Sequence, residues 1–280
     1  MRHCPASLAL GILVVLGPAG AAPIETLRGL DFGSLASREI TIHLPPGGVH
    51  ATTPVIIALD GQMMTAWRLD ESLAALTGRE APLVVAIPAG EARLDEYGLV
   101  ERLDYAGRGK LAAAFQQAVL KSVLPAVVKR YHLELAPART GVMGASLGGL
   151  AAFDLAWRHP EIFGFVGVFS GALWWRGDDT GPAAKQQSRL VHRLVRETVS
   201  PPRLRLWFEA GTKDETDDRD GNGVIDAIQD TTELLTELER RGYRRGTDFT
   251  YVEINGGRHN EATWAGALPA FLEWGLPANH

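Results

Sequence analysis

The sequence predicts an α/β domain built on a mainly parallel sheet. Strand-like apolar runs alternate along the chain with helix-like segments, which is the pattern of parallel strands joined by helical crossovers. Two of these runs, 54–59 and 83–87, are apolar throughout, as expected for strands covered on both faces. The chain has 280 residues with no internal repeat and no low-complexity linker, so residues 22–280 are expected to form a single globular domain.

Residues 1–21 have the features of a secretory signal peptide. Arg2 precedes an apolar run over 8–16, and small residues up to Ala21 form a cleavage site. The apolar run is too short to span a bilayer as a helix, so no membrane span is expected. The only cysteine, Cys4, would leave with the signal, and the mature chain would form no disulfide. The sequence therefore predicts a periplasmic or secreted protein.

The other elements follow from periodicity and turn residues. Strands are expected where β-type runs end at Gly, Pro or Asp turns, at 39–44, 54–59, 83–87, 139–143, 164–169, 203–209 and 249–254. Helices are expected where apolar residues recur at helical spacing, at 67–76, 109–132, 147–158, 183–198, 230–241 and 262–274. Pro125, inside the longest of these helices, predicts a kink or a break.

A G-x-S-x-G motif stands between an expected strand and an expected helix. It reads Gly144-Ala145-Ser146-Leu147-Gly148, and in that context Ser146 would occupy a sharp strand-to-helix turn whose glycines keep Cβ atoms out of the way. Without this context the pentapeptide would suit an ordinary glycine-rich turn. With it, Ser146 is predicted to be a nucleophile, and the backbone N–H groups of Leu147 and Gln62 are predicted to form an oxyanion hole.

A nucleophilic serine needs a histidine base and a carboxylate that orients the base. His259 lies in a glycine-rich loop between the last strand and the last helix, whereas the other histidines after residue 21 fall in strands, helices, turns or at the terminus. Asp214 is the carboxylate nearest the end of strand 203–209, and Asp217 is the alternative in the same loop. The chain order of nucleophile, acid and histidine predicts an α/β-hydrolase fold.

Four further residues are expected near the site. Trp174 and Trp175, directly after a strand, are expected either to line an acyl or aryl pocket, or to pack in the core or anchor at the surface. Arg93 and Glu96 are expected to form a structural ion pair close to the site. The formal net charge of −5 provides no general electrostatic grip on nucleic acid, so the predicted partner is a small-molecule ester.

The acidic loop also carries oxygen side chains at alternate positions around a glycine turn, at Asp218, Asp220, Asn222 and Asp226. This spacing is similar to the start of an EF-hand calcium loop. Gln229 stands where that loop has a bidentate Glu, so Asp226 or Asp230 would have to substitute for it. The sequence therefore predicts either a structural Ca²⁺ that fixes the loop bearing the acid or a polar turn without an ion. No organic cofactor is indicated.

Several of these motifs resemble those of the esterases similar to enterochelin esterase, within the α/β-hydrolases. The resemblance covers about 40–274 and is carried by Leu59-Asp60-Gly61-Gln62, Gly144-Ala145-Ser146-Leu147-Gly148-Gly149, His159-Pro160-Glu161-Ile162-Phe163 and Gly257-Arg258-His259-Asn260. It implies an α/β-hydrolase fold and serine ester hydrolysis. Relatives in this family cleave siderophore trilactones, feruloyl esters and other acyl esters, and some transfer acyl groups.

The sequence thus predicts a secreted or periplasmic serine esterase. It would hydrolyse carboxylic esters through an acyl-enzyme intermediate, with Ser146, His259 and Asp214 as the catalytic triad. The alternatives are an acyltransferase of the same fold and a non-catalytic binding protein that retains it.

Overall fold

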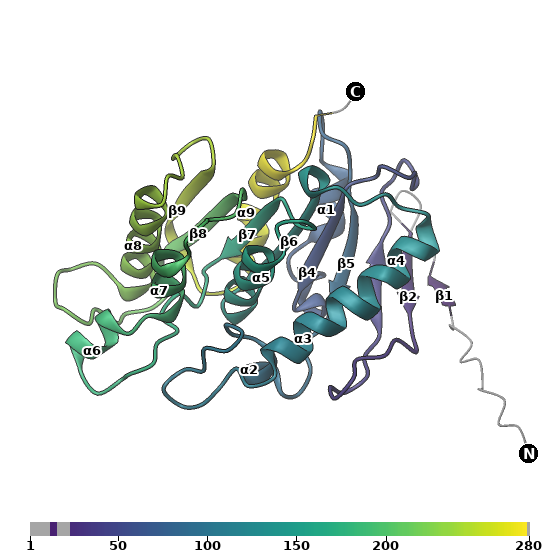
Figure 1. The fold of residues 1–280 in the computed structure, drawn as a ribbon. Helices are drawn as coiled ribbons and strands as arrows, with labels where there is room; N and C mark the ends of the chain where they lie inside the picture. The colour runs from purple at the N-terminus through teal and green to yellow at the C-terminus, as the bar shows by residue number, and fades with distance from the viewer. Residues whose placement is uncertain (1–11, 16–22, 279–280) are drawn as a thin grey trace, which may run out of the picture.

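The computed structural model describes residues 12–15 and 23–278, and in them the strands form one sheet (Figure 1). The strand order is β1-β2-β3-β5-β4-β6-β7-β8-β9. The strands are β1 (Ile12–Val15), β2 (Ile24–Leu27), β3 (Ile40–His43), β4 (Val55–Leu59), β5 (Leu83–Ile87), β6 (Thr140–Ala145), β7 (Phe165–Phe169), β8 (Arg205–Lys213) and β9 (Phe249–Arg258). The strand pairs along β5-β4-β6-β7-β8-β9 are all parallel, and the pairs along β1-β2-β3-β5 are antiparallel. The mainly parallel sheet is therefore confirmed.

The helices cover both faces of the sheet. They are α1 (Leu69–Ala74), α2 (Arg93–Glu96), α3 (Ala112–Ala118), α4 (Leu124–Tyr131), α5 (Leu147–Arg158), α6 (Pro182–Gln187), α7 (Leu190–Glu197), α8 (Asp226–Arg240) and α9 (Glu261–Gly275). Apolar side chains of α3, α4, α5, α7 and α8 pack into the core on one face, and those of α1 and α9 pack into the core on the other. Because both faces are covered, β4, β5, β6 and β7 are buried at every residue.

The N-terminal edge strand lies within the expected signal peptide. β1 pairs antiparallel with β2, with Ile12 opposite Leu27. The remainder of the expected signal, 1–11 and 16–21, lies outside the described residues, so the signal peptide stays a prediction. Cleavage after Ala21 would remove β1 and leave β2 as the edge of the sheet. Within residues 12–15 and 23–278, no helix is long and apolar enough to cross a membrane.

Two expected helices are interrupted in the structure. The segment 109–132 contains α3, a π-helical turn η2 (Val119–Val123) and α4, and Pro125 lies in the first turn of α4. Proline has no backbone N–H and therefore cannot donate a hydrogen bond to the preceding turn. The wider π-helical turn directly before Pro125 accommodates the missing hydrogen bond. The segment 183–198 is divided into α6 and α7.

Strands β8 and β9 are longer than their apolar runs predicted. Their pairing continues beyond the core to Lys213 opposite Arg258. Asp214 and His259 each follow directly on these paired residues. The added strand length therefore brings the predicted acid and the predicted base to the same edge of the sheet.

Candidate active site

The G-x-S-x-G motif forms the predicted turn between β6 and α5. Ser146 is the N-cap of α5, with φ 55° and ψ −124°, and its N–H donates to the Phe169 carbonyl oxygen at 2.9 Å. A Cβ atom on Gly144 would lie 2.5 Å from the carbonyl carbon of Gly148. Only glycine allows the strand and helix to approach this closely, and the approach holds the serine at the exit of β6.

The exit of β4 packs against this elbow. The Asp60 Oδ2 atom lies 2.7 Å from the position of a Cβ on Gly148. Arg93 donates from Nε and Nη2 to the two carboxylate oxygens of Asp60, each at 2.7 Å. The expected Arg93–Glu96 pair was wrong, because Glu96 instead accepts two hydrogen bonds from Arg38 at 2.7 Å. Arg93 therefore holds the Asp60 carboxylate at the β4 exit, where Asp60 lies against the elbow.

Three non-glycine residues with positive φ mark the ends of neighbouring strands. Asp60 (φ 55°) follows β4, Ser146 (φ 55°) follows β6 and Ser170 (φ 42°) follows β7. Such backbone conformations cost free energy and persist where the surrounding packing imposes them, as often occurs at functional sites. The strained positions coincide with the edge at which ligands bind in open α/β sheets.

A cavity of about 240 Å³ opens above this edge. It is lined by Ser146, Ser170, Gly171, Ala172, Trp174, Asp214, Glu215, Ala227, Asp230 and His259. The predicted nucleophile, acid and base thus lie in one cavity, although they are distant in sequence. Asp217, the alternative acid, lines the adjoining cavity and not this one.

His259 lines the cavity and lies directly before the N-cap of α9. Asn260 is the N-cap of that helix and accepts a hydrogen bond from the Thr263 N–H at 3.1 Å. The His259 ring meets Trp264 edge-on, with the ring centroids 5.3 Å apart. Partial burial lowers the pKa of His259, Asp214 opposes this by raising it, and Arg93 lowers it further, so the net pKa lies below the ordinary value. A lowered pKa keeps the imidazole neutral near pH 7, as a general base requires.

The Asp214 carboxylate has no hydrogen-bond partner among the described residues. Both of its oxygens are buried, and Oδ1 lies 2.8 Å from the position of a Cβ on Gly211. A buried carboxylate without donors is costly, so its two oxygens are available for groups that complete the site.

The two predicted oxyanion donors differ in their placement. Leu147 is the first residue of α5, and N–H groups in the first turn of a helix have no acceptor within it. Gln62 lies in the 3₁₀ turn η1 (Gly61–Met63) after β4, and its Oε1 accepts from the Ala89 N–H at 3.0 Å. Gln62 is not among the residues that line the cavity of Ser146, so its oxyanion role stays a prediction.

The two adjacent tryptophans have different surroundings. Trp174 lines the cavity of Ser146 and also an adjoining cavity of about 400 Å³. Trp175 is fully buried, and its Nε1–H donates to the Arg102 carbonyl oxygen at 3.0 Å. Of the alternatives expected for Trp175, the structure shows core packing and not pocket lining, because its ring fills the space left by the absent side chains of Gly98 and Gly109.

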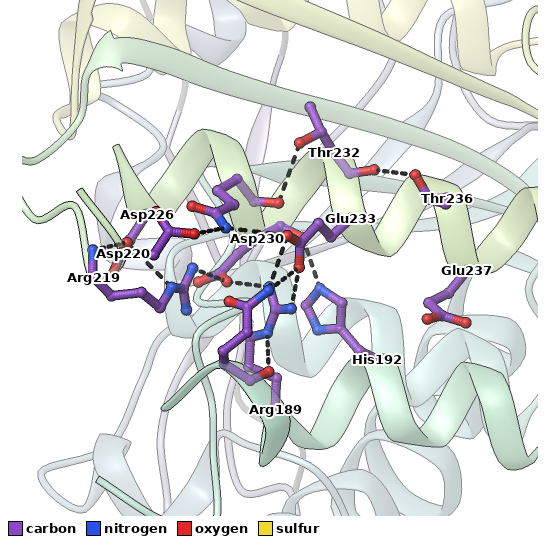
Figure 2. A network of polar contacts seen from close by, with 12 residues as sticks. Arg189, His192, Arg219, Asp220, Asp226, Asp230, Thr232, Glu233, Thr236 and Glu237 are labelled. Carbon is purple, nitrogen blue, oxygen red and sulfur yellow. Dashed lines mark hydrogen bonds and ion pairs between the residues drawn. The ribbon is translucent and has the colours of Figure 1, made fainter. Parts of the chain in front are cut away.

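The acidic loop after Asp214 is fastened by a buried ion-pair network (Figure 2). Arg219, whose side chain is 2% exposed, pairs with Asp226 at 3.2 Å and also with Asp230. Arg189, at the start of α7, pairs with the same Asp230 at 2.5 Å and with Glu233. The loop that bears the predicted acid is thereby tied to α7 and α8 by guanidinium groups.

The expected calcium ligands are engaged in other contacts. Asp218 accepts hydrogen bonds from the backbone N–H groups of Asn222 and Gly223, at 3.1 and 2.9 Å. Asp220 accepts from Gln229 at 2.9 Å, and Asp226 accepts from the Arg219 N–H at 2.8 Å. Within the described part of the chain, no group of three or more His, Cys, Asp or Glu residues is placed to hold a metal ion. Calcium binding therefore stays a prediction for experiment.

Two polar residues beside the site had not been singled out from the sequence. Ser170 lines the cavity, and its Oγ accepts from the Trp264 Nε1–H at 2.9 Å. Glu209 is 1% exposed in β8 and is the acceptor for the Ser170 Oγ–H at 3.4 Å. An acidic residue directly after the apolar residues 206–208 was the only sequence signal for Glu209.

The elbow, the order of the site residues and the sheet topology together define an α/β-hydrolase fold. Residues 36–274 match the family described as "Putative esterase", and the chain belongs to this family.

Curated relatives agree with this family. The chain is 28% identical over 252 residues to the uncharacterized protein YbbA of Bacillus subtilis, covering 85% of this chain and 92% of the relative. It is 32% identical over 235 residues to the iron(III) enterobactin esterase of Dickeya dadantii, covering 80% of this chain. The match spans about half of that enzyme's length, 48%.

Solved structures share the fold. The enterobactin esterase FES of Shigella flexneri matches with a TM-score of 0.64 at 23% identity, over 91% of this chain and 59% of that one. A ferulic acid esterase matches with a TM-score of 0.66 at 15% identity, over 90% and 98% of the two chains. The family supports an esterase, and these structures show that the fold is shared.

Proposed function

We propose that this protein hydrolyses carboxylic esters through an acyl-enzyme intermediate. Ser146 would be the nucleophile, His259 the general base and Asp214 the carboxylate that orients the base. The proposal is supported chiefly by the cavity that these three side chains line at the exits of β6, β8 and β9, above a strained strand-to-helix turn. A Ser-His-Asp triad requires these three types of side chain in one site.

The reaction would proceed by the steps of a serine hydrolase. Neutral His259 takes the Ser146 hydroxyl proton as Oγ attacks the ester carbonyl, and Asp214 stabilises the imidazolium that forms. The Leu147 N–H at the start of α5 stabilises the oxyanion, with the Gln62 N–H as the second donor. His259 then protonates the leaving alcohol, and it activates the water that hydrolyses the acyl-enzyme.

The substrate would extend from the cavity of Ser146 into its neighbour. The two cavities share Trp174 and Glu215, and the larger one is also lined by Tyr105, Arg108 and Arg176. Aromatic faces and guanidinium groups suit a planar, polar substituent on the ester. Two similar proteins are named as an enterobactin esterase and a ferulic acid esterase, and these names are consistent with such a substituent. We propose that the substrate is an ester with an aromatic substituent.

Replacement of the nucleophile tests the assignment. We expect Ser146→Ala to lower kcat for p-nitrophenyl esters by about 10⁶-fold, because the covalent step is lost. It should also abolish labelling by a fluorophosphonate. Ser34→Ala, at an exposed loop position, is the matched control and should retain both. Hydrolysis or labelling that persists in Ser146→Ala would refute the assignment, and absence of labelling in the parent would favour a non-catalytic binding protein.

We also propose that the protein acts in the periplasm or outside the cell. Residues 1–21 support this, since they carry the charge, apolar run and small-residue site of a signal peptide. N-terminal sequencing of the secreted form should find a chain that begins after Ala21.

A further inference from the structure

A second carboxyl group lies buried beside the predicted catalytic acid. Glu209 is 1% exposed, and its Oε1 has no hydrogen-bond partner among the described residues. Asp214, five residues along the chain, has two buried oxygens, and neither has a hydrogen-bond partner among the described residues. Glu209 and Gly211 are two residues apart on β8, so their Cα–Cβ directions point to the same face of the sheet. On that face Asp214 Oδ1 lies against Gly211. The unpartnered oxygens of both carboxyl groups thus belong to one buried region.

We propose that Glu209 is held as a protonated carboxyl group whose Oε1–H donates a hydrogen bond to the Asp214 carboxylate. This bond satisfies the orphan oxygen of Glu209 and one of the two orphan oxygens of Asp214, which leaves the other for the His259 ring. Glu209 is then a positioning residue that fixes the orientation of the acid. The catalytic consequence rests on the proposed Ser-His-Asp function, whereas the carboxyl pair itself does not.

The other Glu209 oxygen, Oε2, accepts the last hydrogen bond of a chain that begins at Trp264, the residue packed against the predicted base. The Trp264 Nε1–H donates to Ser170 Oγ at 2.9 Å, and the Ser170 hydroxyl donates to Glu209 Oε2 at 3.4 Å. Trp264 is also the residue whose ring contacts His259. With its proton on Oε1, Glu209 would accept from Ser170 on one side and donate to Asp214 on the other, so both oxygens are satisfied.

The electrostatic surroundings favour the neutral form of Glu209. Burial, and then the negative charge of Asp214, raise the pKa of Glu209 from 4.5 to about 8. Like charges held close together cannot both remain ionised at low cost. On the neighbouring strand β9, Tyr251 and Glu253 add no positive charge, and the pKa of Tyr251 is itself raised, first by burial and also by Glu253, Glu209 and Asp214.

The proposal predicts how activity responds to pH. Ionisation of Glu209 near pH 8 would remove the donated proton and place a second charge beside Asp214. We therefore expect kcat of the parent protein to fall as the pH rises through about 8. Glu209→Gln keeps a donor that cannot ionise, so it should retain most of the parent's kcat at pH 7 and lose this alkaline decrease. Glu209→Met has similar length and no donor, and should lose about 100-fold in kcat with little change in KM.

Stability supplies a test that does not depend on catalysis. Because the pKa of Glu209 is higher in the folded state, the folded protein binds more protons than the unfolded chain between pH 4.5 and about 8. Stability falls across this window as the pH rises. Glu209→Gln removes that cost, so its gain in melting temperature over the parent should grow from pH 4.5 to pH 8. An infrared difference spectrum between the two proteins at pH 7 should show the carbonyl band of a protonated carboxyl group in the parent.

Glu96 is the matched control. It is also a buried glutamate, 2% exposed, but Arg38 binds both of its oxygens. Glu96→Gln should lower the melting temperature at pH 7, because it leaves the Arg38 charge unpaired.

The inference would be overturned if the melting difference for Glu209→Gln did not change with pH and the infrared band were absent. It would also be overturned if Glu209→Gln lost as much kcat as Glu209→Met, because the donor would then not matter. If the parent hydrolysed no ester, the proposed function would fail, and the melting and infrared measurements would still decide the carboxyl pair.

Discussion

The two halves of the candidate site are built differently. On the elbow side, at the exits of β4 and β6, polar groups are paired and glycines bring the backbones together. Asp60 is 1% exposed and accepts hydrogen bonds from Nε and Nη2 of Arg93, and Gly144 and Gly148 are in contact. On the loop side, at the exits of β8 and β9, the carboxylate of Asp214 has no partner among the described residues.

The proposed nucleophile is therefore held in place by different contacts from those that hold the proposed acid and base. The serine is positioned by backbone packing, which tolerates almost no added volume. The acid and the base are positioned by a few side-chain contacts, which can be weakened one at a time. Substitution of the elbow glycines should therefore act through folding, and substitution of Asp214 should act through turnover.

After loss of the proposed nucleophile itself, the largest effect is expected from Asp214→Asn. It should lower kcat by about 10³–10⁴-fold with little loss of stability, because the amide no longer holds the His259 tautomer or stabilises the imidazolium. Asp214 also raises the pKa of His259, so its loss should move the acidic limb of the kcat/KM profile to lower pH. Initial rates across pH, together with thermal melts, would measure both.

Asp217→Asn is the matched control for the acid. It lies in the same loop and lines only the adjoining cavity, so its kcat should stay within about tenfold of the parent. The reverse order of the two variants would transfer the role of the acid to Asp217.

The next effect is expected on the elbow side. Gly144→Ala places a Cβ 2.5 Å from the backbone of Gly148, where no flexible side chain can move away. We expect a loss of about 3 kcal/mol in the free energy of unfolding, measured by urea denaturation. Gly266→Ala is the control, since its Cβ would meet nothing within 4 Å in α9 and should stabilise the helix by about 0.5–1 kcal/mol. Equal stability of the two variants would show that the elbow is not tightly packed.

A smaller effect is expected from the ion-pair network. Arg219→Met removes one cation from Asp226 and Asp230 while Arg189 still compensates Asp230. The loss should be about 2 kcal/mol, below the 3–5 kcal/mol typical of an isolated buried pair. Arg193→Met, whose side chain is 48% exposed, should change stability by less than about 0.5 kcal/mol. An effect of Arg219→Met as small as that control would mean that the network does not fasten the loop.

The same melting experiments check the calcium prediction. If the loop binds Ca²⁺, the ion should raise the melting temperature of the parent, and Asp220→Ala should abolish the rise. Absence of a rise would leave the guanidinium groups as the cations that hold the loop.

Much of the site could be predicted because its chemistry is local in sequence. Glycines two residues on either side of Ser146 specify the elbow, and a histidine in a glycine-rich loop predicts the base. Apolar runs with different periods specified the order of strands and helices. These signals depend on neighbouring residues, and tertiary contacts do not need to be known to interpret them.

Other features depended on contacts between distant segments. The partners of Arg93 and Trp175 could not be inferred, because Asp60 and the two glycines that accommodate the indole come from other loops. The length of β8 and β9 was underestimated because their last residues pair with each other outside the apolar core. The same pairing places Asp214 beside His259.

The sequence by itself determined the fold class and the elbow and singled out the candidate base, because each is encoded by a short pattern of residue types. Only the tertiary structure decided which carboxylate shares the cavity with Ser146 and that Glu209 lies buried beside it. The physical reason is that burial and pairing of charged groups are set by elements far apart in the chain, and a charge reveals its role only when its surroundings are known.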